Sequence, residues 1–247
     1  VPKNEFVQRK LRALCDRGLS PSALGAWLRC PLDFYFKYVA GIKEDDPVDG
    51  QLRSDVLGNA IHSTLQHLYA PAIGQQLSPS FVAEARERAE WILSDELAKV
   101  IPRAALDHGH PRLRREMAAK ALDAHLESEQ LRCASTPTVP MAAELEVEAS
   151  LHNGVRLKGR CDRIIMRDGS LTVLDVKTGK VDSDQIKLPS LDRAAIKPDK
   201  QYALQLLIYL WAYLRQHPEV HQASAGVIPL QRPSQEHDLR LTIGDEV

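Results

Sequence analysis

Two short segments contain residues that could bind a metal ion and activate water. Segment 159–163 reads GRCDR and segment 174–179 reads LDVKTG. Asp162 and Asp175 offer carboxylate oxygens, the hard ligands that suit Mg²⁺ and Mn²⁺. Lys177 lies two residues beyond Asp175, so in a strand the two side chains project from the same face. This set could hold a divalent cation, and the lysine could position or deprotonate a water molecule.

The turn between the two segments determines how they meet. The Asp-Gly dipeptide at 168–169 is a strong signal for a β-hairpin with a two-residue loop. Such a loop pairs Arg167 with Ser170 and places Asp162 directly opposite Asp175. Like charges that face each other across two strands are destabilising unless something compensates for them, and a divalent cation would do so. The alternative, which spacing alone favours equally, is a surface hairpin with an ordinary salt bridge.

The hairpin is expected to belong to a three-stranded antiparallel meander over residues 143–152, 155–167 and 170–177, joined by Asn-Gly and Asp-Gly turns. A two-residue loop at Asn153-Gly154 would pair Leu145 with Asp162. The alternating glutamates would then point to the opposite face of the sheet, so we do not expect them to be ligands. They are Glu144, Glu146 and Glu148.

Two helices could complete the site. The first runs from about residue 55 to 70, and His62 lies at the border of its apolar face, where it could be a ligand or an ordinary packed histidine. The second runs from Gln201 to about Gln216, and a polar stripe that includes Gln205 and Tyr209 follows its length. Buried amides and hydroxyls are normally hydrogen-bonded, so this stripe is either a core network or a polar strip that faces the site.

The remaining pattern predicts an α/β fold. Long helical patterns at about 79–100 and 111–132 form a helical layer or lobe, which we treat as an insertion at about 78–135. A further strand is expected at 223–230. The sheet is therefore mixed, with an antiparallel meander, one more strand and flanking helices, and we expect a single domain over residues 1–247.

Composition excludes some classes of function. The chain has 247 residues, and 32 Lys and Arg stand against 33 Asp and Glu, so a surface for nucleic acid must be local. The best local patch consists of arginines and histidines within residues 103–115, which a solvated helix start explains equally well. The cysteines at 15, 30, 133 and 161 have no metal-finger spacing, which indicates free thiols in a reducing compartment.

No segment has the length of a membrane span, and the start of the chain lacks the pattern of a secretion signal. We therefore expect a cytoplasmic location and no association with membranes. Because the first residue is Val1 and not methionine, we also expect this chain to be one domain of a longer protein.

Five motifs, in this order, resemble the PD-(D/E)XK nuclease superfamily, in particular the RecB-like nuclease domains, which include AddB-like and stand-alone relatives. They are an opening segment with LSPSAL and CPLDFYF at 19–36, LGNAIH at 57–62, GRCDRI at 159–164, DVKTG at 175–179, and a QxxxY pair at Gln205 and Tyr209. The resemblance spans most of the chain. It implies a restriction-endonuclease-like core with a helical insertion.

The resemblance also implies roles for individual residues. His62, Asp162, Asp175 and the backbone carbonyl of Val176 would hold Mg²⁺ or Mn²⁺, and Lys177 would orient or activate the attacking water. Gln205 and Tyr209 would support the site and the DNA backbone. The implied activity is metal-dependent hydrolysis of DNA in recombination or double-strand-break repair. The resemblance favours an exonuclease over an endonuclease. It also implies a helicase domain or subunit as a partner.

One departure from the family concerns iron. Some relatives bind an iron–sulfur cluster through a cysteine in the opening segment and three further cysteines after the QxxxY helix. Cys30 matches the first position, but no cysteine follows Cys161 in this chain, so we expect no such cluster. Two alternatives to the nuclease remain, namely a non-catalytic DNA-binding or scaffolding domain with the nuclease fold in a helicase–nuclease complex, and a protein unrelated to nucleic acids.

Overall fold

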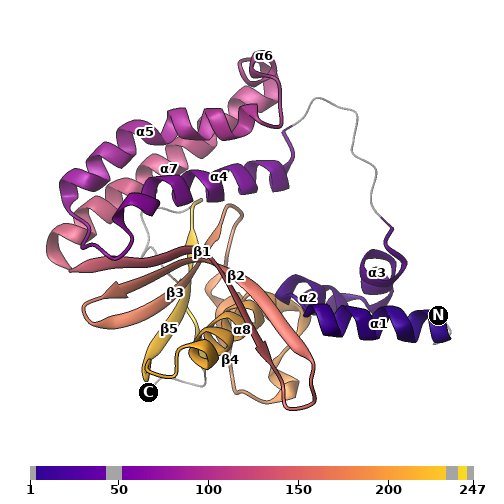
Figure 1. Cartoon of the computed structure of the whole chain (residues 1–247). Coiled ribbons are helices and arrows are strands. Elements are labelled where there is room, and N and C mark those ends of the chain that lie inside the picture. The colour runs from indigo at the N-terminus through magenta and orange to yellow at the C-terminus, as the bar shows by residue number, and fades with distance from the viewer. Residues whose placement is uncertain (1–3, 43–51, 232–238, 244–247) are drawn as a thin grey trace.

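The computed structural model describes residues 4–42, 52–231 and 239–243 (Figure 1). Its α-helices are α1 (Glu5–Arg17), α2 (Pro21–Arg29), α3 (Pro31–Phe34), α4 (Ser54–Tyr69), α5 (Pro79–Ala98), α6 (Arg103–Leu106), α7 (Gly109–Ser135) and α8 (Gln201–Gln216). Its strands are β1 (Thr138–Ser150), β2 (Arg156–Arg167), β3 (Ser170–Lys177), β4 (Lys187–Leu188), β5 (Ala223–Pro229), β6 (Leu239–Arg240) and β7 (Thr242–Ile243).

The central sheet is mixed. Its strand order is β1-β2-β3-β5-β6, with antiparallel pairing from β1 to β3, a parallel β3–β5 pair and an antiparallel β5–β6 pair. Helix α8 connects β3 to β5, as a parallel pair requires a crossover. The structure thus confirms the predicted α/β, restriction-endonuclease-like arrangement of a meander plus a further strand, flanked by helices.

Helices cover both faces of the sheet (Figure 1). On one face Ile165 and Leu174 pack into a core shared with α4, α5 and α7. On the other face Ile164 and Val173 pack into a core shared with α8. Successive strand residues point to opposite faces, so neighbours in β2 and β3 alternate between the two cores.

The turn between β2 and β3 has the predicted form. Asp168 and Gly169 both have positive φ, at 48° and 76°, as a two-residue type I′ loop requires. Arg167 pairs with Ser170, and the pairing continues to Arg163 and Leu174. The register expected for this hairpin is therefore confirmed from Arg167 to Arg163, but the regular pairing ends there and the expected pair of Asp162 with Asp175 is not part of the ladder.

The turn between β1 and β2 differs from the prediction by one residue. The Leu151 carbonyl accepts a hydrogen bond from Gly154, and the Leu151 amide donates to the Val155 carbonyl, which closes a three-residue loop instead of a two-residue loop. Gly154 takes a left-handed φ of 81°, the conformation that such a loop needs at its last position. Ser150 consequently pairs with Arg156. An Asn-Gly pair is compatible with either loop, so the dipeptide alone could not distinguish them.

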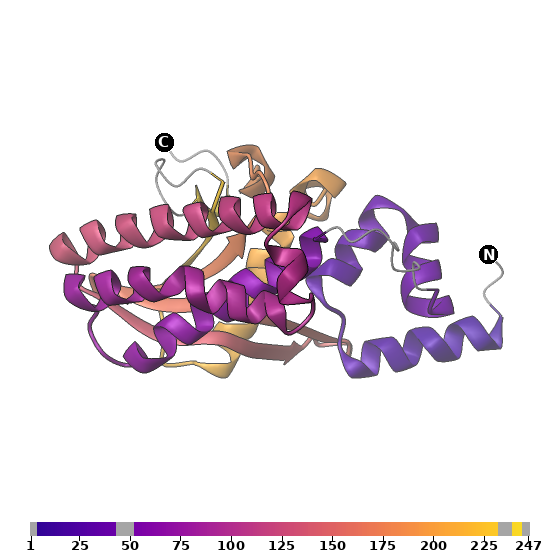
Figure 2. The same cartoon turned by 90° about the horizontal axis from the view of Figure 1, so that it is seen from above.

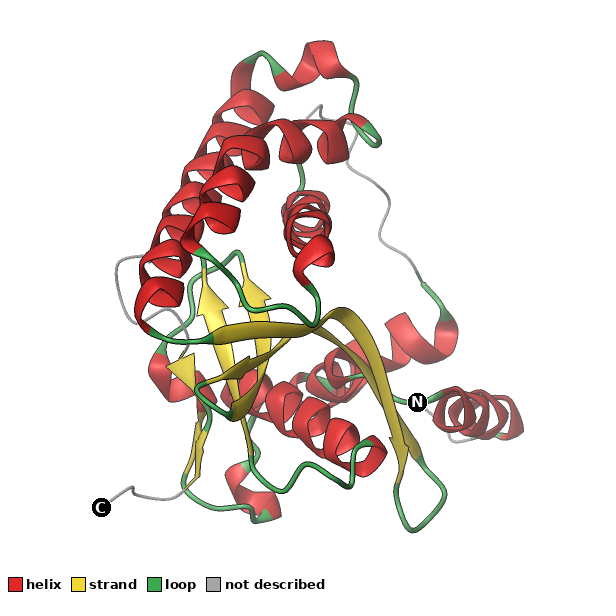
Figure 3. Ribbon diagram, turned by 60° about the vertical axis from the view of Figure 1, so that its left-hand side comes forward, coloured by secondary structure: helices red, strands yellow, loops and turns green. Residues whose placement is uncertain are grey.

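This one-residue shift changes which residues face each other. Leu145 pairs with Cys161 and not with Asp162, and Ala143 pairs with Arg163. Glu144 and Asp162 lie between these two pairs. The prediction that Glu144 points away from the site is therefore wrong, because a shift of one residue moves a side chain to the other face of a strand. Figure 3 shows the long, curved hairpin that β1 and β2 form.

Helices α1 to α3 project beside the main body (Figure 2). Ser20 is the N-cap of helix α2, because Ser20 Oγ accepts a hydrogen bond from the Ala23 amide at 3.2 Å. Among the described residues, no helix is both long and apolar enough to span a membrane. All four cysteines are free thiols, as expected.

Candidate active site

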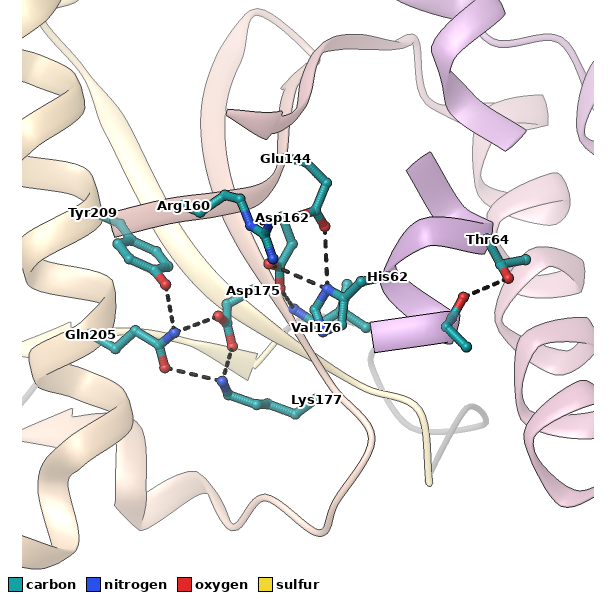
Figure 4. A network of polar contacts seen from close by, with 11 residues as sticks. His62, Thr64, Glu144, Arg160, Asp162, Asp175, Val176, Lys177, Gln205 and Tyr209 are labelled. Carbon is teal, nitrogen blue, oxygen red and sulfur yellow. Dashed lines mark hydrogen bonds and ion pairs between the residues drawn. The ribbon is translucent and has the colours of Figure 1, made fainter. Parts of the chain in front are cut away.

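Asp175 and Lys177 belong to a hydrogen-bonded network with two residues of α8 (Figure 4). Lys177 Nζ forms an ion pair with Asp175 Oδ2 at 2.8 Å. Lys177 Nζ also donates to Gln205 Oε1 at 3.0 Å. The Gln205 amide nitrogen donates to Asp175 Oδ1 and contacts the Tyr209 hydroxyl, each at 2.8 Å. The polar stripe of α8 thus faces the strand residues, and Gln205 holds the carboxylate and the ammonium group in a fixed relation.

The Asp175 carboxylate is almost completely buried, with 2% exposure. Burial and the nearby charge of Asp162 raise the pKa of Asp175 to about 6, although Lys177 acts in the opposite direction. A carboxylate in such a place is costly to ionise unless positive charge is supplied. Asp175 is therefore a group whose charge would be stabilised by a cation.

At the end of the β2–β3 ladder, the side chain of Asp162 takes the place of a backbone carbonyl as hydrogen-bond acceptor. Its Oδ2 accepts a hydrogen bond of 2.6 Å from the Val176 amide. On the other side of β3, the Lys177 carbonyl accepts from the Leu230 amide at 3.0 Å. Because backbone groups alternate along a strand, both the amide and the carbonyl of Val176 point toward β2. This orientation is compatible with the Val176 carbonyl as a ligand.

His62 reaches the sheet from α4. Its Nδ1 lies 3.4 Å from Asp162 Oδ1 and 3.4 Å from Glu144 Oε1. One ligand atom from each of His62, Glu144 and Asp162 lies within 4.8 Å of the others. Burial by itself would lower the pKa of His62, but hydrogen bonding and charge attraction from Asp162 and Glu144 raise it to about 10. The two carboxylates thus create a strong preference for positive charge at this point.

Glu144 is the main residue that sequence reasoning missed. Its Oε2 forms an ion pair with Arg160 Nε at 2.8 Å. The only sequence signal for it was the second possible loop length at Asn153-Gly154. The predicted ligands do not all meet in one cluster, because Asp175 lies with Lys177 and Gln205, whereas Glu144 joins His62 and Asp162.

Gly159, the first residue of the GRCDR segment, makes room for Tyr209. A Cβ atom placed on Gly159 would lie 2.2 Å from Cε1 of the Tyr209 ring. No side chain can be accommodated at that distance without movement of the ring. Gly159 therefore allows α8 to approach β2 closely enough for the Gln205 network to form.

A buried ionic cluster supports the site from the side of the helical lobe. Arg163 follows Asp162 directly and forms an ion pair of 3.0 Å with Glu129 of α7. The Arg163 guanidinium also lies 3.8 Å from the ring centroid of Tyr69, in α4. Arg163 and Glu129 are 4% and 2% exposed. This cluster joins the strand that carries Asp162 to two helices, one of which carries His62.

The basic patch within residues 103–115 is largely occupied with internal contacts. Arg103 pairs with Asp95 at 2.6 Å, and Arg112 pairs with Glu116 at 2.8 Å. Arg114 donates to the Leu52 carbonyl at 3.1 Å. The Arg103 and Arg112 side chains remain 66% and 58% exposed, so these contacts agree with a solvated helix start.

The chemistry of the donor atoms fits a divalent cation. An imidazole nitrogen and carboxylate oxygens converge at this end of the sheet, and such donors bind Mg²⁺, Mn²⁺ and related ions. An ammonium group lies beside them, held by Gln205. Together these groups have the composition of a metal-dependent hydrolytic centre.

Comparison with protein families agrees with this geometry. The model of the PD-(D/E)XK nuclease superfamily matches residues 18–243. The chain belongs to this superfamily, and the recognition based on its motifs is confirmed. No curated protein matches the sequence. The superfamily indicates a nuclease that hydrolyses phosphodiester bonds, and His62, Glu144 and Asp162 form a group that could hold a metal ion.

Proposed function

We propose that this protein is a Mg²⁺- or Mn²⁺-dependent deoxyribonuclease of the RecB-like type, acting at DNA ends in recombination or double-strand-break repair. The superfamily match, the contact of His62 with Asp162 and the ion pair of Asp175 with Lys177 support this proposal. We further propose that residues 1–247 form one nuclease domain with α5–α7 as its insertion, and that it works with a helicase domain or subunit.

In this proposal His62, Asp162, Asp175 and the Val176 carbonyl hold the ion. A bound divalent ion supplies Lewis acidity, which lowers the pKa of water and stabilises charge on the phosphate. The residues contribute from three separate elements, α4, β2 and β3. Their positions depend on the packing of the helical lobe against the sheet.

Lys177 is the proposed residue for water positioning. Its ammonium group is held between Asp175 Oδ2 and Gln205 Oε1, at 2.8 and 3.0 Å. Two fixed partners leave the third N–H of the ammonium group available to a water molecule or a phosphate oxygen. Gln205 and Tyr209 act as positioning residues, because their hydrogen bonds restrict where Asp175 and Lys177 can move.

The observation that carries the proposal is the bridging contact of Gln205 with both Asp175 and Lys177. An ordinary surface salt bridge would be exposed and mobile, whereas here the Asp175 side chain is 3% exposed, accepts a hydrogen bond from Gln205 on Oδ1 and forms its ion pair with Lys177 through Oδ2. This favours a preorganised catalytic pair over a surface ion pair.

Cleavage of end-labelled DNA tests the proposal. Linear single- and double-stranded DNA and covalently closed circles are incubated with the protein in Mg²⁺, Mn²⁺ or EDTA. We expect metal-dependent degradation of linear DNA, little cleavage of circles, and loss of activity in Asp175→Asn. Cleavage of closed circles would indicate an endonuclease.

Binding of DNA without turnover in either metal would contradict the catalytic proposal and support the scaffolding alternative. Activity that survives in Asp162→Asn and Asp175→Asn together would show that the assigned residues do not form the catalytic centre.

A further inference from the structure

We propose that Glu144 is an additional metal ligand, supplied by β1 through an irregular backbone conformation. This inference rests on the proposed function, because it adds a ligand to the same metal site. The site would then combine one imidazole nitrogen, from His62, with carboxylates from β1 and β2.

The first support is the spacing of the donor atoms. His62 Nδ1 lies 3.4 Å from one oxygen of each carboxylate. Hydrogen bonds from nitrogen to oxygen are normally about 2.7–3.2 Å long, and one N–H cannot point along both directions at once. Adjacent ligands of an octahedral ion with bonds of about 2.1 Å lie about 3 Å apart. The arrangement is thus close to that of a coordination shell.

The second support is the burial of these side chains. Glu144 and Asp162 side chains are only 9% and 10% exposed, and His62 is 22% exposed. Two carboxylates so close together and so far from water repel each other strongly. Among the described residues, Glu144 forms ion pairs with His62 and Arg160 alone. The Arg160 side chain is 59% exposed.

The third support is how Arg160 divides the Glu144 carboxylate. Arg160 Nε pairs with Oε2 at 2.8 Å, whereas Oε1 is the atom that faces His62. A charged partner on one oxygen leaves the other as a single, oriented donor atom. Metal-binding carboxylates are commonly held in this way by neighbouring groups.

The backbone of β1 agrees with this role. Glu144 has a φ of 52°, which is uncommon for a residue other than glycine. The regular pairs on either side, Ala143 with Arg163 and Leu145 with Cys161, leave Glu144 and Asp162 outside the ladder. The two strands depart from regular pairing at the same place, and both carboxylates turn toward His62 there.

Calorimetric titration with Mn²⁺ tests the proposal without relying on catalysis. The full chain, Glu144→Gln, Asp162→Asn and the control Glu146→Gln are compared. Glu146 is an exposed glutamate on the same strand, two residues further on. We expect Glu144→Gln to weaken Mn²⁺ binding by about tenfold or more, in the range known for ligand-supporting groups, and Glu146→Gln to bind within about twofold of the wild type.

A second variant reports on ligation directly. In Glu144→Cys, Cd²⁺ should produce the ultraviolet charge-transfer band of a thiolate bound to cadmium, because cysteine is deprotonated when it coordinates a metal. Wild type and Glu146→Cys provide the background from the native cysteines. Asparagine tolerates a left-handed backbone conformation. In the absence of metal, Glu144→Asn should therefore have the same thermal unfolding midpoint as the wild type, whereas its affinity for Mn²⁺ should be lower.

The outcomes distinguish failure of the Glu144 ligand assignment from failure of the proposed metal-dependent function. If Asp162→Asn abolishes Mn²⁺ binding but Glu144→Gln does not weaken it and Glu144→Cys gives no band, Glu144 is not a ligand and the proposed function stands. If the wild type does not bind Mn²⁺ at millimolar concentration, or Asp162→Asn has no effect, both the ligand assignment and the metal-dependent function are overturned.

Discussion

Lys177 is the side chain whose removal should separate catalysis from metal binding. Its ammonium group contacts Asp175 and Gln205 but is not itself a donor to a cation. We expect Lys177→Met to reduce the rate of DNA cleavage by about 10²–10⁴-fold, as is typical when a group that assists proton transfer is lost. Mn²⁺ affinity should change little by comparison.

The matched control is Lys180→Met, three residues further on. Lys180 is 58% exposed and pairs only with the exposed Asp182 among the partners that the structure describes. Its loss should leave the rate of cleavage within about twofold. Equal loss of rate in both lysine variants would show that general charge, and not the held ammonium group, supports the reaction.

The second prediction concerns the single methyl group that Gly159→Ala would add. In Gly159→Ala the new methyl group would meet the Tyr209 ring. We expect the free energy of unfolding to fall by about 1–3 kcal/mol through overpacking, together with a loss of cleavage as Gln205 is displaced. Denaturant unfolding and a cleavage assay measure the two effects.

Gly179→Ala is the control for stability, because nothing lies within 4 Å of a Cβ at that position. The double variant Gly159→Ala with Tyr209→Ala should lose less free energy of unfolding than the sum of the losses in the two single variants, because removal of the Tyr209 ring relieves the clash with the new methyl group. Strict additivity would mean that the two residues do not clash.

Glu144 illustrates what could not be predicted for a single residue. The positions of Asp162, Asp175 and Lys177 on β2 and β3 could be predicted because a two-residue turn of unambiguous form joins these strands. The position of Glu144 depends on the length of the loop at Asn153-Gly154, which this dipeptide does not determine. It also depends on a positive φ at Glu144, which no local sequence pattern predicts for a glutamate. Contacts of His62 likewise depend on how α4 packs on the sheet.

The contact between β2 and α7 is the best place to test how helices support the site. Glu129 and Arg163 form a buried ion pair at 3.0 Å. We expect Glu129→Gln to lower the free energy of unfolding by about 3–5 kcal/mol, because it leaves the Arg163 charge uncompensated in the core. Chemical denaturation at neutral pH measures this change.

Glu127→Gln on the same helix is the control, since Glu127 is 58% exposed and lies 3.6 Å from Arg86. Its effect should stay within about 0.5 kcal/mol. A loss of that small size in Glu129→Gln as well would show that the buried pair does not hold α7 against the sheet.

The same pair predicts a pH dependence of stability. Burial would raise the pKa of Glu129, but Arg163 and other neighbouring cations lower it from 4.5 to about 2. Because the pKa is lower in the folded state, the stabilisation is complete above the unfolded-state pKa and is lost as pH falls toward about 2. Unfolding free energies between pH 5 and 3 should fall less steeply in Glu129→Gln than in the wild type, and parallel curves would contradict this assignment.

Most helices and strands followed from periodicity and end signals. Helix α8 and strand β3 begin and end at the predicted residues, whereas β2 begins at Arg156 instead of residue 155, and β1 spans Thr138–Ser150 instead of residues 143–152. Local patterns determine these elements because hydrophobic periodicity and capping act over a few residues. The pairing register of β1 with β2 and the ionic cluster around Arg163 depend on contacts distant in sequence, and they required the structure.

The molecule as a whole carries a net charge of −1, so its affinity for DNA must come from local contacts near the site. The proposed ion would link α4, through His62, to both β1 and β2. Binding to the folded state alone stabilises a protein. With Mn²⁺ at 100 times its Kd, we expect the free energy of unfolding to rise by about 2.7 kcal/mol, and Asp162→Asn should show no such rise in thermal unfolding.

Anomalous diffraction from crystals soaked in Mn²⁺ tests the central claim most directly, because it locates the ion without reference to activity. We expect a manganese peak within coordination distance of His62 Nδ1 and the facing oxygens of Asp162 and Glu144, with Asp175 and the Val176 carbonyl as the remaining protein donors. A peak only at exposed carboxylates, or no peak at millimolar Mn²⁺ with these side chains well ordered, would contradict it.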